Sequence, residues 1–298
     1  MRKWVFIINN WNSTSLEVKK KYCRKGIPQQ FRRKVWRLFL LGTKGAKGKA
    51  AERGKPYSYY SELPLEDTQL EGVIERDLDR TFPTHRKFDS GANGEGQQAL
   101  RRMLRAYANY NRGVGYCQGM GFLAATLLLQ INEEERAFWC FCSLMEEEEY
   151  NLKSLYEPGF PMLQCYFSVF EGLMKKTNKK VYHHVREVHG VESSYYATHW
   201  FLTLFTYYLN FGLISRIWDM FLCEGWKIIF RFALALLKID QQRLLGAATE
   251  TELLMVLKDI QENKEPAKML DVSLKIKFTT KYMNKLKKSY LDSQQRKK

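Results

Sequence analysis

The segment Ile74-Glu75-Arg76-Asp77-Leu78-Asp79-Arg80-Thr81-Phe82-Pro83 has the pattern of a short helix that ends at an arginine. Ile74 and Leu78 are one helical turn apart, while Asp77 and Arg80 are three residues apart on a neighbouring face. Pro83 cannot continue the helix and favours extended backbone at the residue before it. We therefore expect Arg80 in the last turn, oriented by the Asp77 carboxylate through a charge-assisted hydrogen bond. A plain surface ion pair at a helix C-terminus is the alternative.

A second segment, Gly115-Tyr116-Cys117-Gln118-Gly119, lies between a turn and a long apolar run. The turn is Asn111-Arg112-Gly113-Val114-Gly115, and the apolar run covers residues 122–129. Residues two positions apart can face the same side, so we expect Tyr116 and Gln118 together at the start of a buried helix. The Gln118 carboxamide can donate and accept hydrogen bonds, which suits a functional role and equally suits local bonding at a helix start.

Taken together, the pattern Ile74-x-x-Asp77-x-x-Arg80-Thr81 followed by Tyr116-x-Gln118 resembles the paired signature of TBC-domain GTPase-activating proteins for Rab GTPases. Three further motifs also resemble this family, and the five motifs follow one another in the order that the family has. The three further motifs are Gly26-Ile27-Pro28 with Arg32, Arg33 and Trp36, then Trp200-Phe201-Leu202-Thr203-Leu204-Phe205, then Ile217-Trp218-Asp219-Met220-Phe221-Leu222. The resemblance covers residues 22–245 and implies an all-α, two-lobed TBC domain.

The resemblance also implies a mechanism in which two side chains enter the nucleotide site of a Rab-type GTPase. In the family, the arginine at the position of Arg80 stabilises the charge that develops during GTP hydrolysis. An arginine supplied in trans raises such rates by roughly 10³ to 10⁵. The glutamine at the position of Gln118 replaces the water-positioning glutamine of the GTPase. Tyr116 would contact the GTPase or brace its own loop. The supporting or partner-binding positions are Ile74, Asp77, Thr81 and Tyr116.

No cofactor or metal of its own is expected for this chain, because GTP and Mg²⁺ would be carried by the partner GTPase. A phosphate-binding loop is excluded, since Gly48-Lys49 is followed by Ala50 and the preceding glycine, Gly42, is one position too far away. The resemblance therefore implies an activator that supplies residues in trans without turning over a substrate of its own. A catalytically silent TBC-like adaptor that binds a Rab or a membrane is the alternative, and the presence of both Arg80 and Gln118 favours the activator.

Helical spacing of apolar residues recurs along the chain, and no convincing run of alternating strands is found. We predict an N-terminal extension at residues 1–21, a first lobe at 22–150, a second lobe at 151–245, and a C-terminal helical part at 246–298. Residues 44–56, rich in glycine, lysine and alanine, are predicted to form an exposed loop. Asp219 is predicted to be a helix N-cap or a buried, hydrogen-bonded carboxylate in the second lobe.

The chain is strongly basic, with 48 lysine and arginine residues against 32 aspartate and glutamate residues, a formal charge of +16 and a pI near 9.5. Such a field attracts anions of several classes. The tail carries an apolar stripe at Phe278, Tyr282, Leu286 and Tyr290, flanked by Lys277, Lys281, Lys285, Lys287 and Lys288. It could lie on an anionic membrane or pack against the second lobe. No nucleic acid is expected as a partner, because no recognisable basic-aromatic binding module is present.

Composition sets the class of protein. With 45% hydrophobic residues the chain can bury a large core, and it lacks an apolar run of about 18 residues that would span a membrane. Its first residues do not form a secretory signal, and its six cysteines show no CxxC pair, which is typical of reduced thiols. We expect a cytoplasmic Rab activator of vesicle trafficking and intracellular protein transport, with peripheral endomembrane contact as a further option.

Overall fold

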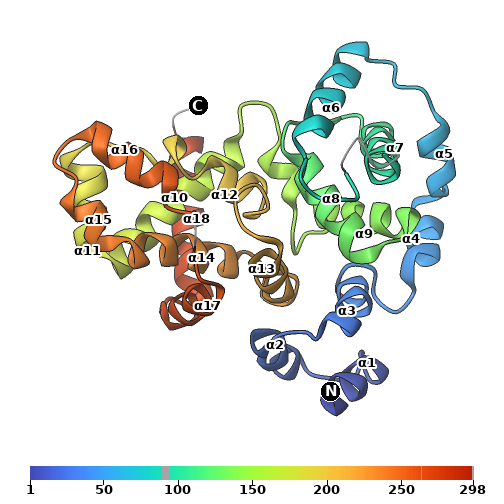
Figure 1. Ribbon diagram of the computed structural model, residues 1–298, viewed down its shortest axis with the longest axis horizontal. Helices are drawn as coiled ribbons and strands as arrows, with labels where there is room; N and C mark the ends of the chain where they lie inside the picture. The colour runs from blue at the N-terminus through green and yellow to red at the C-terminus, as the bar shows by residue number, and fades with distance from the viewer. Residues whose placement is uncertain (89–93, 263, 297–298) are drawn as a thin grey trace. The chain divides into compact units, whose positions relative to one another are not determined.

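The structure is a computed structural model that describes residues 1–88, 94–262 and 264–296 (Figure 1). The regular elements of these residues are helices, and no strand occurs among them. The predicted all-α class is therefore confirmed. None of the helices in the described ranges is both long and apolar enough to cross a lipid bilayer.

The chain divides into two compact units. Unit 1 comprises Met1–Tyr156 and Trp218–Cys223, and unit 2 comprises Glu157–Ile217 and Glu224–Lys298. The short segment Trp218–Cys223 thus belongs to unit 1 although Glu157–Ile217 of unit 2 separates it from the rest of that unit in the sequence. All six residues of the predicted site lie in unit 1.

Unit 1 is built around α8 (Met120–Ile131), which is buried along almost its whole length. A helix that is apolar all round belongs in a core, and α7 and α9 pack against α8, as do α3 and α6 (Figure 1). The other helices of the unit are α1 (Arg2–Asn9), α2 (Leu16–Lys25), α3 (Gln29–Leu41), α4 (Gly45–Arg53), α5 (Tyr57–Glu62), α6 (Thr68–Arg80), α7 (Glu95–Tyr110) and α9 (Glu134–Glu146), with a 3₁₀ turn at Leu152–Leu155.

Helix α6 begins and ends as its sequence predicts. The Asp67 carboxylate caps the start by accepting hydrogen bonds from the N–H groups of Gln69 at 2.8 Å and Leu70 at 3.1 Å. Buried side chains of α6 face α7 and α8, and the last helical residue is Arg80. The predicted position of this arginine in the final turn is therefore confirmed.

The backbone just after α6 differs from expectation. Phe82, which precedes Pro83, was predicted to be extended, but its φ is +48°, in the left-handed region. Its ring packs against the rings of Phe88 and Phe122, with centroids 6.3 Å and 5.4 Å away. Tertiary packing of this aromatic side chain offsets the local cost of the backbone conformation.

The loop predicted at residues 44–56 is also a helix over most of its length. Helix α4 spans Gly45–Arg53, buries Ala46, and packs against α3 and α9. Gly54, with φ of +77°, ends it. Gly45 and Gly48 lower the helix propensity of α4, but the packing of one face of the helix against α3 and α9 stabilises it.

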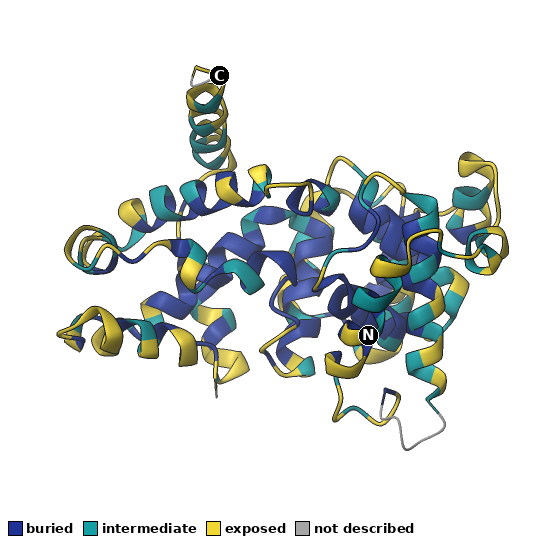
Figure 2. Cartoon of the chain, turned by 90° about the horizontal axis from the view of Figure 1, so that it is seen from above, coloured by how far each residue is buried: buried dark blue, intermediate teal, exposed yellow. Residues whose placement is uncertain are grey.

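Unit 2 has α14 (Trp226–Ile239) as its most buried helix, with α10 and α17 packed against it. Helix α18 packs against α10, where Leu286 lies so close to Gly172 that a Cβ on the glycine would be 3.0 Å from it. The apolar stripe of the tail thus lies against unit 2, but its α18 members are only half-buried, and no residue of α18 is fully buried (Figure 2). The remaining elements are α10 (Pro161–Thr177), α11 (Lys179–Tyr182), α12 (Thr198–Leu202), α15 (Gln241–Gly246), α16 (Glu250–Asp259), α17 (Pro266–Lys275) and α18 (Thr280–Gln295), a π-helical segment at His183–Val188, a 3₁₀ turn at Ser193–Tyr195, and α13 (Phe211–Glu224), whose residues are divided between the units.

Candidate functional site

The carboxylate of Asp77 is the centre of the site. It is fully buried on the inner face of α6. Its Oδ1 accepts a hydrogen bond from Nε of Arg80, and its Oδ2 accepts one from the Tyr116 hydroxyl and one of 2.8 Å from the backbone N–H of Gly119. A buried charge is stable only when donors surround it in this way. One side chain therefore joins the end of α6 to the loop that leads into α8.

Arg80 projects from the surface while its base is held. Its side chain is 39% exposed, whereas that of Asp77 is 0% exposed. Only Nε is engaged, since no other residue in the part of the chain that the structure describes accepts a hydrogen bond from the two terminal nitrogens. The outer fork of the guanidinium, with its planar array of N–H donors, is thus available for an anionic oxygen of a partner.

Gln118 is the other exposed side chain of the paired motif. The loop turns at Gly115, with φ of +61°, and at Gly119, with φ of +102°, conformations that an L side chain rarely adopts. Gly119 is also the N-cap of α8 and has no side chain to cap it, and in the first turn of the helix the N–H of Gly121 donates to the Tyr116 hydroxyl. Gln118 therefore does not cap α8, and within the described ranges its carboxamide has no recorded hydrogen bond.

Tyr116 is a buried brace. Its side chain is 6% exposed, and its hydroxyl both donates to Asp77 and accepts a 3.2 Å hydrogen bond from the N–H of Gly121. Burial, and then the nearby Asp77 charge, raise the pKa of Tyr116 well above its usual value of 10. The hydroxyl therefore remains protonated and keeps donating to the carboxylate at any physiological pH.

Two more motif residues support the site from inside unit 1. Ile74 is fully buried, and so is Thr81, whose hydroxyl donates a 2.6 Å hydrogen bond to the Asp77 carbonyl. Neither is available to a partner. Of the six predicted site residues, only Arg80 and Gln118 are exposed.

Gly121 is a functional position that our sequence interpretation missed. A Cβ built there would come within 3.0 Å of the Thr81 hydroxyl oxygen, 3.2 Å of the Tyr116 hydroxyl oxygen and 3.5 Å of Asp77 Oδ2. Only a glycine lets α8 approach this network so closely. The signal in the sequence was a glycine placed just inside the apolar helix, directly after the YxQ segment.

A second buried carboxylate, Asp219, stabilises unit 1 elsewhere. It accepts hydrogen bonds from Arg32 Nε at 2.9 Å, Trp36 Nε1 at 2.8 Å and the N–H of Ile27 at 3.2 Å. Burial raises the pKa of Asp219, and the Arg32 charge opposes that effect. The prediction of a buried, hydrogen-bonded carboxylate is confirmed, but its predicted place in the second lobe is wrong, because the hydrogen bonds of Asp219 go to residues of unit 1. It connects the opening motif of the sequence to the segment Trp218–Cys223.

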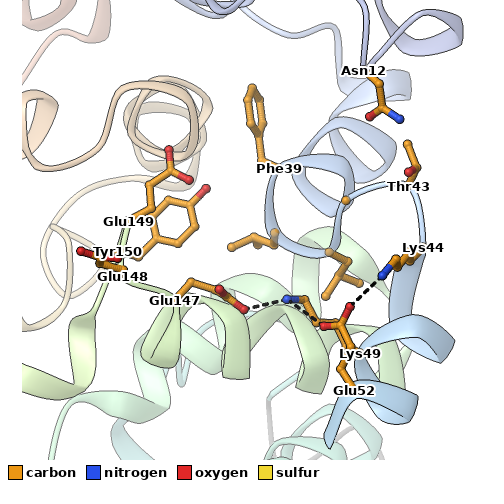
Figure 3. Close-up of a pocket in the computed structure, with 13 residues that line it drawn as sticks. Asn12, Phe39, Thr43, Lys44, Lys49, Glu52, Glu147, Glu148, Glu149 and Tyr150 are labelled. Atoms are coloured by element: carbon orange, nitrogen blue, oxygen red, sulfur yellow. Dashed lines mark hydrogen bonds and ion pairs between the residues drawn. The ribbon is translucent and has the colours of Figure 1, made fainter.

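A hollow of unit 1 lies apart from the motif residues, and none of them is among its described lining residues. It has a volume of about 820 Å³ and is lined by the end of α3, by α4 and by residues 147–150 (Figure 3). Lys49 lies between Glu147 and Glu52, with Nζ to oxygen distances of 2.6 and 3.5 Å. The two lysines of this hollow, Lys44 and Lys49, are thus paired with Glu52 and Glu147. Within the described sequence, no group of three or more potential metal ligands is found.

Comparisons with known proteins show the family of the chain. Residues 29–245 match the Rab-GTPase-TBC domain family. The chain is 33% identical over 292 residues to the human "Ecotropic viral integration site 5 protein homolog", which covers 96% of this chain and 34% of that protein. It is 34% identical over 296 residues to the "Rab GTPase-activating protein eat-17" of Caenorhabditis elegans, which covers 97% of this chain and 31% of that protein. The chain thus spans about a third of the length of these curated relatives.

A solved structure has the same fold. The TBC domain of a flagellar RabGAP from Chlamydomonas superposes with a TM-score of 0.72 at 30% identity, covering 91% of this chain and 89% of that one. The family match extends over well more than half of the sequence. This chain belongs to the Rab-GTPase-TBC domain family.

Proposed function

We propose that this protein stimulates GTP hydrolysis by a Rab-type small GTPase and that Arg80 and Gln118 are the side chains it supplies. The observation that carries the proposal is their shared support: Asp77 bonds Arg80 through one oxygen and the residue after Gln118 through the other. Family membership supports the activity, as does the name of the relative from Caenorhabditis elegans, which states Rab GTPase activation.

The role proposed for Arg80 follows from the chemistry of phosphoryl transfer. Negative charge develops on oxygens of the transferred phosphoryl and the leaving group, and a guanidinium placed against them lowers the barrier. Asp77 holds Nε, so the terminal nitrogens need little reorganisation when the GTPase binds. Preorganised charge is more effective than charge that must be oriented during the reaction.

The role proposed for Gln118 is to hold the attacking water. Its carbonyl oxygen can accept a hydrogen bond from the water while its amide group donates to a phosphate oxygen. Gly119 is bonded to Asp77 at 2.8 Å, so the backbone beside Gln118 is fixed although the side chain is exposed. GTP and Mg²⁺ would belong to the GTPase, and this chain would contribute only side chains and a docking surface.

The experiment is a measurement of phosphate release from a panel of GTP-loaded Rab GTPases, with wild type and Arg80→Ala. We expect at least one Rab to be accelerated by roughly 10³-fold or more, and Arg80→Ala to remove most of that effect while the protein stays folded. A wild-type protein that binds a GTP-loaded Rab and accelerates none of the panel would instead be an adaptor.

A further inference from the structure

Lysine side chains gather around two neighbouring hollows of unit 2, here called the lysine groove. The first hollow, of about 340 Å³, lies where α10, α14 and α17 end, and its lysines are Lys176, Lys238, Lys275 and Lys277. The second, of about 570 Å³, lies beside the start of α18 and is lined by Lys176 with Lys281, Lys285 and Lys288. Lys176 lines both hollows, so the two adjoin at this side chain.

The charges of the lysine groove are largely uncompensated. Among the residues that the structure describes, no acidic side chain lines either hollow. Lys275 pairs with Asp271 at 2.7 Å, and no other lysine of the groove has an ion-pair partner among the residues described. The arginines of α7 behave differently, because Arg101 and Arg105 each pair with a glutamate of α6. The groove is therefore a local concentration of charge beyond the general basicity of the chain.

The lysines on α18 share one face. Lys281, Lys285 and Lys288 are at positions i, i+4 and i+7, where like charges destabilise a helix by roughly 0.2–0.5 kcal/mol per pair. No acidic residue occupies the first turn of α18, although the partial positive charge of a helix start favours one. An anion lying against this face would remove the repulsion and use the same partial charge.

The first hollow also contains a neutral polar residue. Asn178 lines it, and the side-chain nitrogen of this residue is buried and has no hydrogen-bond partner in the described part of the chain. The three helix ends at this hollow each contribute about half a negative charge. Four lysines, of which one is paired, outweigh them. The hollow therefore keeps a net positive charge.

We propose that the lysine groove binds a small ligand that carries several phosphate groups, of the kind found on a phosphorylated inositol. A cavity of about 340 Å³ is in the range of small-molecule sites, and lysines spaced across two hollows match several phosphates better than one. The shared chemistry occurs on soluble inositol phosphates and on membrane headgroups. A nucleic acid is disfavoured because Lys176 already covers the Tyr282 ring, at 4.0 Å from its centroid. This site is independent of the proposed GTPase activation.

The test uses the whole chain, inositol hexakisphosphate as the soluble probe, and three kinds of vesicle. The vesicles contain phosphatidylcholine alone, with phosphatidylserine, or with phosphatidylinositol bisphosphate at matched total charge. The variant is Lys281→Glu/Lys285→Glu/Lys288→Glu. The matched control, Lys3→Glu/Lys21→Glu/Lys47→Glu, makes the same change of net charge at exposed lysines of unit 1.

We expect calorimetry to show binding of inositol hexakisphosphate to wild type and to the control, and a loss of about a hundredfold in the groove variant. The probe should also raise the melting temperature of wild type and leave that of the variant unchanged. If the protein binds both inositol hexakisphosphate and vesicles that contain phosphatidylinositol bisphosphate, the ligand is a membrane headgroup. If it binds inositol hexakisphosphate and no vesicle, the ligand is a free inositol phosphate. Equal binding to both kinds of charged vesicle, or equal weakening in the control, would overturn the proposal.

Discussion

The buried carboxylate of Asp77 accepts a 2.8 Å hydrogen bond from the backbone N–H of Gly119, the residue that follows Gln118. The same carboxylate bonds Arg80 three residues further along α6. Two segments about forty positions apart in the sequence therefore depend on one side chain. Any change that weakens the hydrogen bonds to this carboxylate should therefore disturb both exposed residues, Arg80 and Gln118, at once.

We predict that Asp77→Asn destabilises the protein by about 1–3 kcal/mol and lowers GTPase stimulation. An amide group in place of one oxygen would face a donor, either Arg80 Nε or the pair formed by the Tyr116 hydroxyl and the Gly119 N–H. Denaturant unfolding measures the change. Asp79→Asn, at an exposed position of the same helix, is the control and should stay within about 0.5 kcal/mol. Equal stability of both variants would contradict the central role of Asp77.

Two glycines should respond in opposite ways to alanine. Gly121→Ala pushes a methyl group against the Thr81 and Tyr116 hydroxyl oxygens, so we expect a loss of about 1–3 kcal/mol and reduced stimulation. Gly72→Ala lies within α6, where a Cβ would meet only Arg76 Nη1 at 3.5 Å, and should raise stability by roughly 0.5–1 kcal/mol. Thermal melting of the two variants measures whether each is less or more stable than wild type. A Gly121→Ala protein that is more stable than wild type would contradict the close contact between Gly121 and the hydroxyl groups.

Cys117, next to Gln118, should behave as an unreactive thiol at neutral pH. Burial, and then the Asp77 charge, raise its pKa above the usual value. A raised pKa leaves less thiolate at a given pH. The rate of alkylation should therefore continue to rise with pH above about pH 8.5, the ordinary pKa of a cysteine. Peptide mapping after iodoacetamide treatment at several pH values measures this. The curve should move to lower pH in Asp77→Asn, and a plateau below about pH 8.5 in wild type would contradict the prediction.

Arg80→Lys should lose most of the stimulation although the charge is kept. An ammonium cannot donate through Nε to Asp77 and through a planar fork to phosphate oxygens at the same time. We expect a fall of about a hundredfold or more in the stimulated rate. Arg76→Lys, at an exposed position one turn earlier, should leave the rate within about twofold. A fully active Arg80→Lys protein would show that Arg80 does not act as the supplied arginine.

The sequence predicts much of the local structure of the site because its signals are local. The end of α6 follows from Pro83, and burial of α8 follows from its continuous apolar run. The exposure of Gln118 and the closeness of Gly121 to the network depend on contacts between α6 and α8, and no spacing within one segment reveals them.

Errors in the sequence interpretation have the same origin. Helix α4 was predicted as a loop from its glycines, and Phe82 was predicted as extended from the proline after it. In each case packing against another element outweighs a weak local preference. The lysine groove similarly combines the ends of several helices of unit 2, and among its lysines the sequence pattern revealed Lys277 and those of α18 but not Lys176, Lys238 or Lys275.

The most direct test of the central claim is single-turnover phosphate release by a responsive Rab whose own water-positioning glutamine has been replaced by leucine. Because Gln118 is proposed to hold the attacking water, wild-type protein should still stimulate this GTPase, Gln118→Ala should not, and Gln69→Ala, at another exposed position of unit 1, should match wild type. Stimulation by Gln118→Ala equal to that by wild type, or failure of wild type on the substituted GTPase alone, would contradict the account.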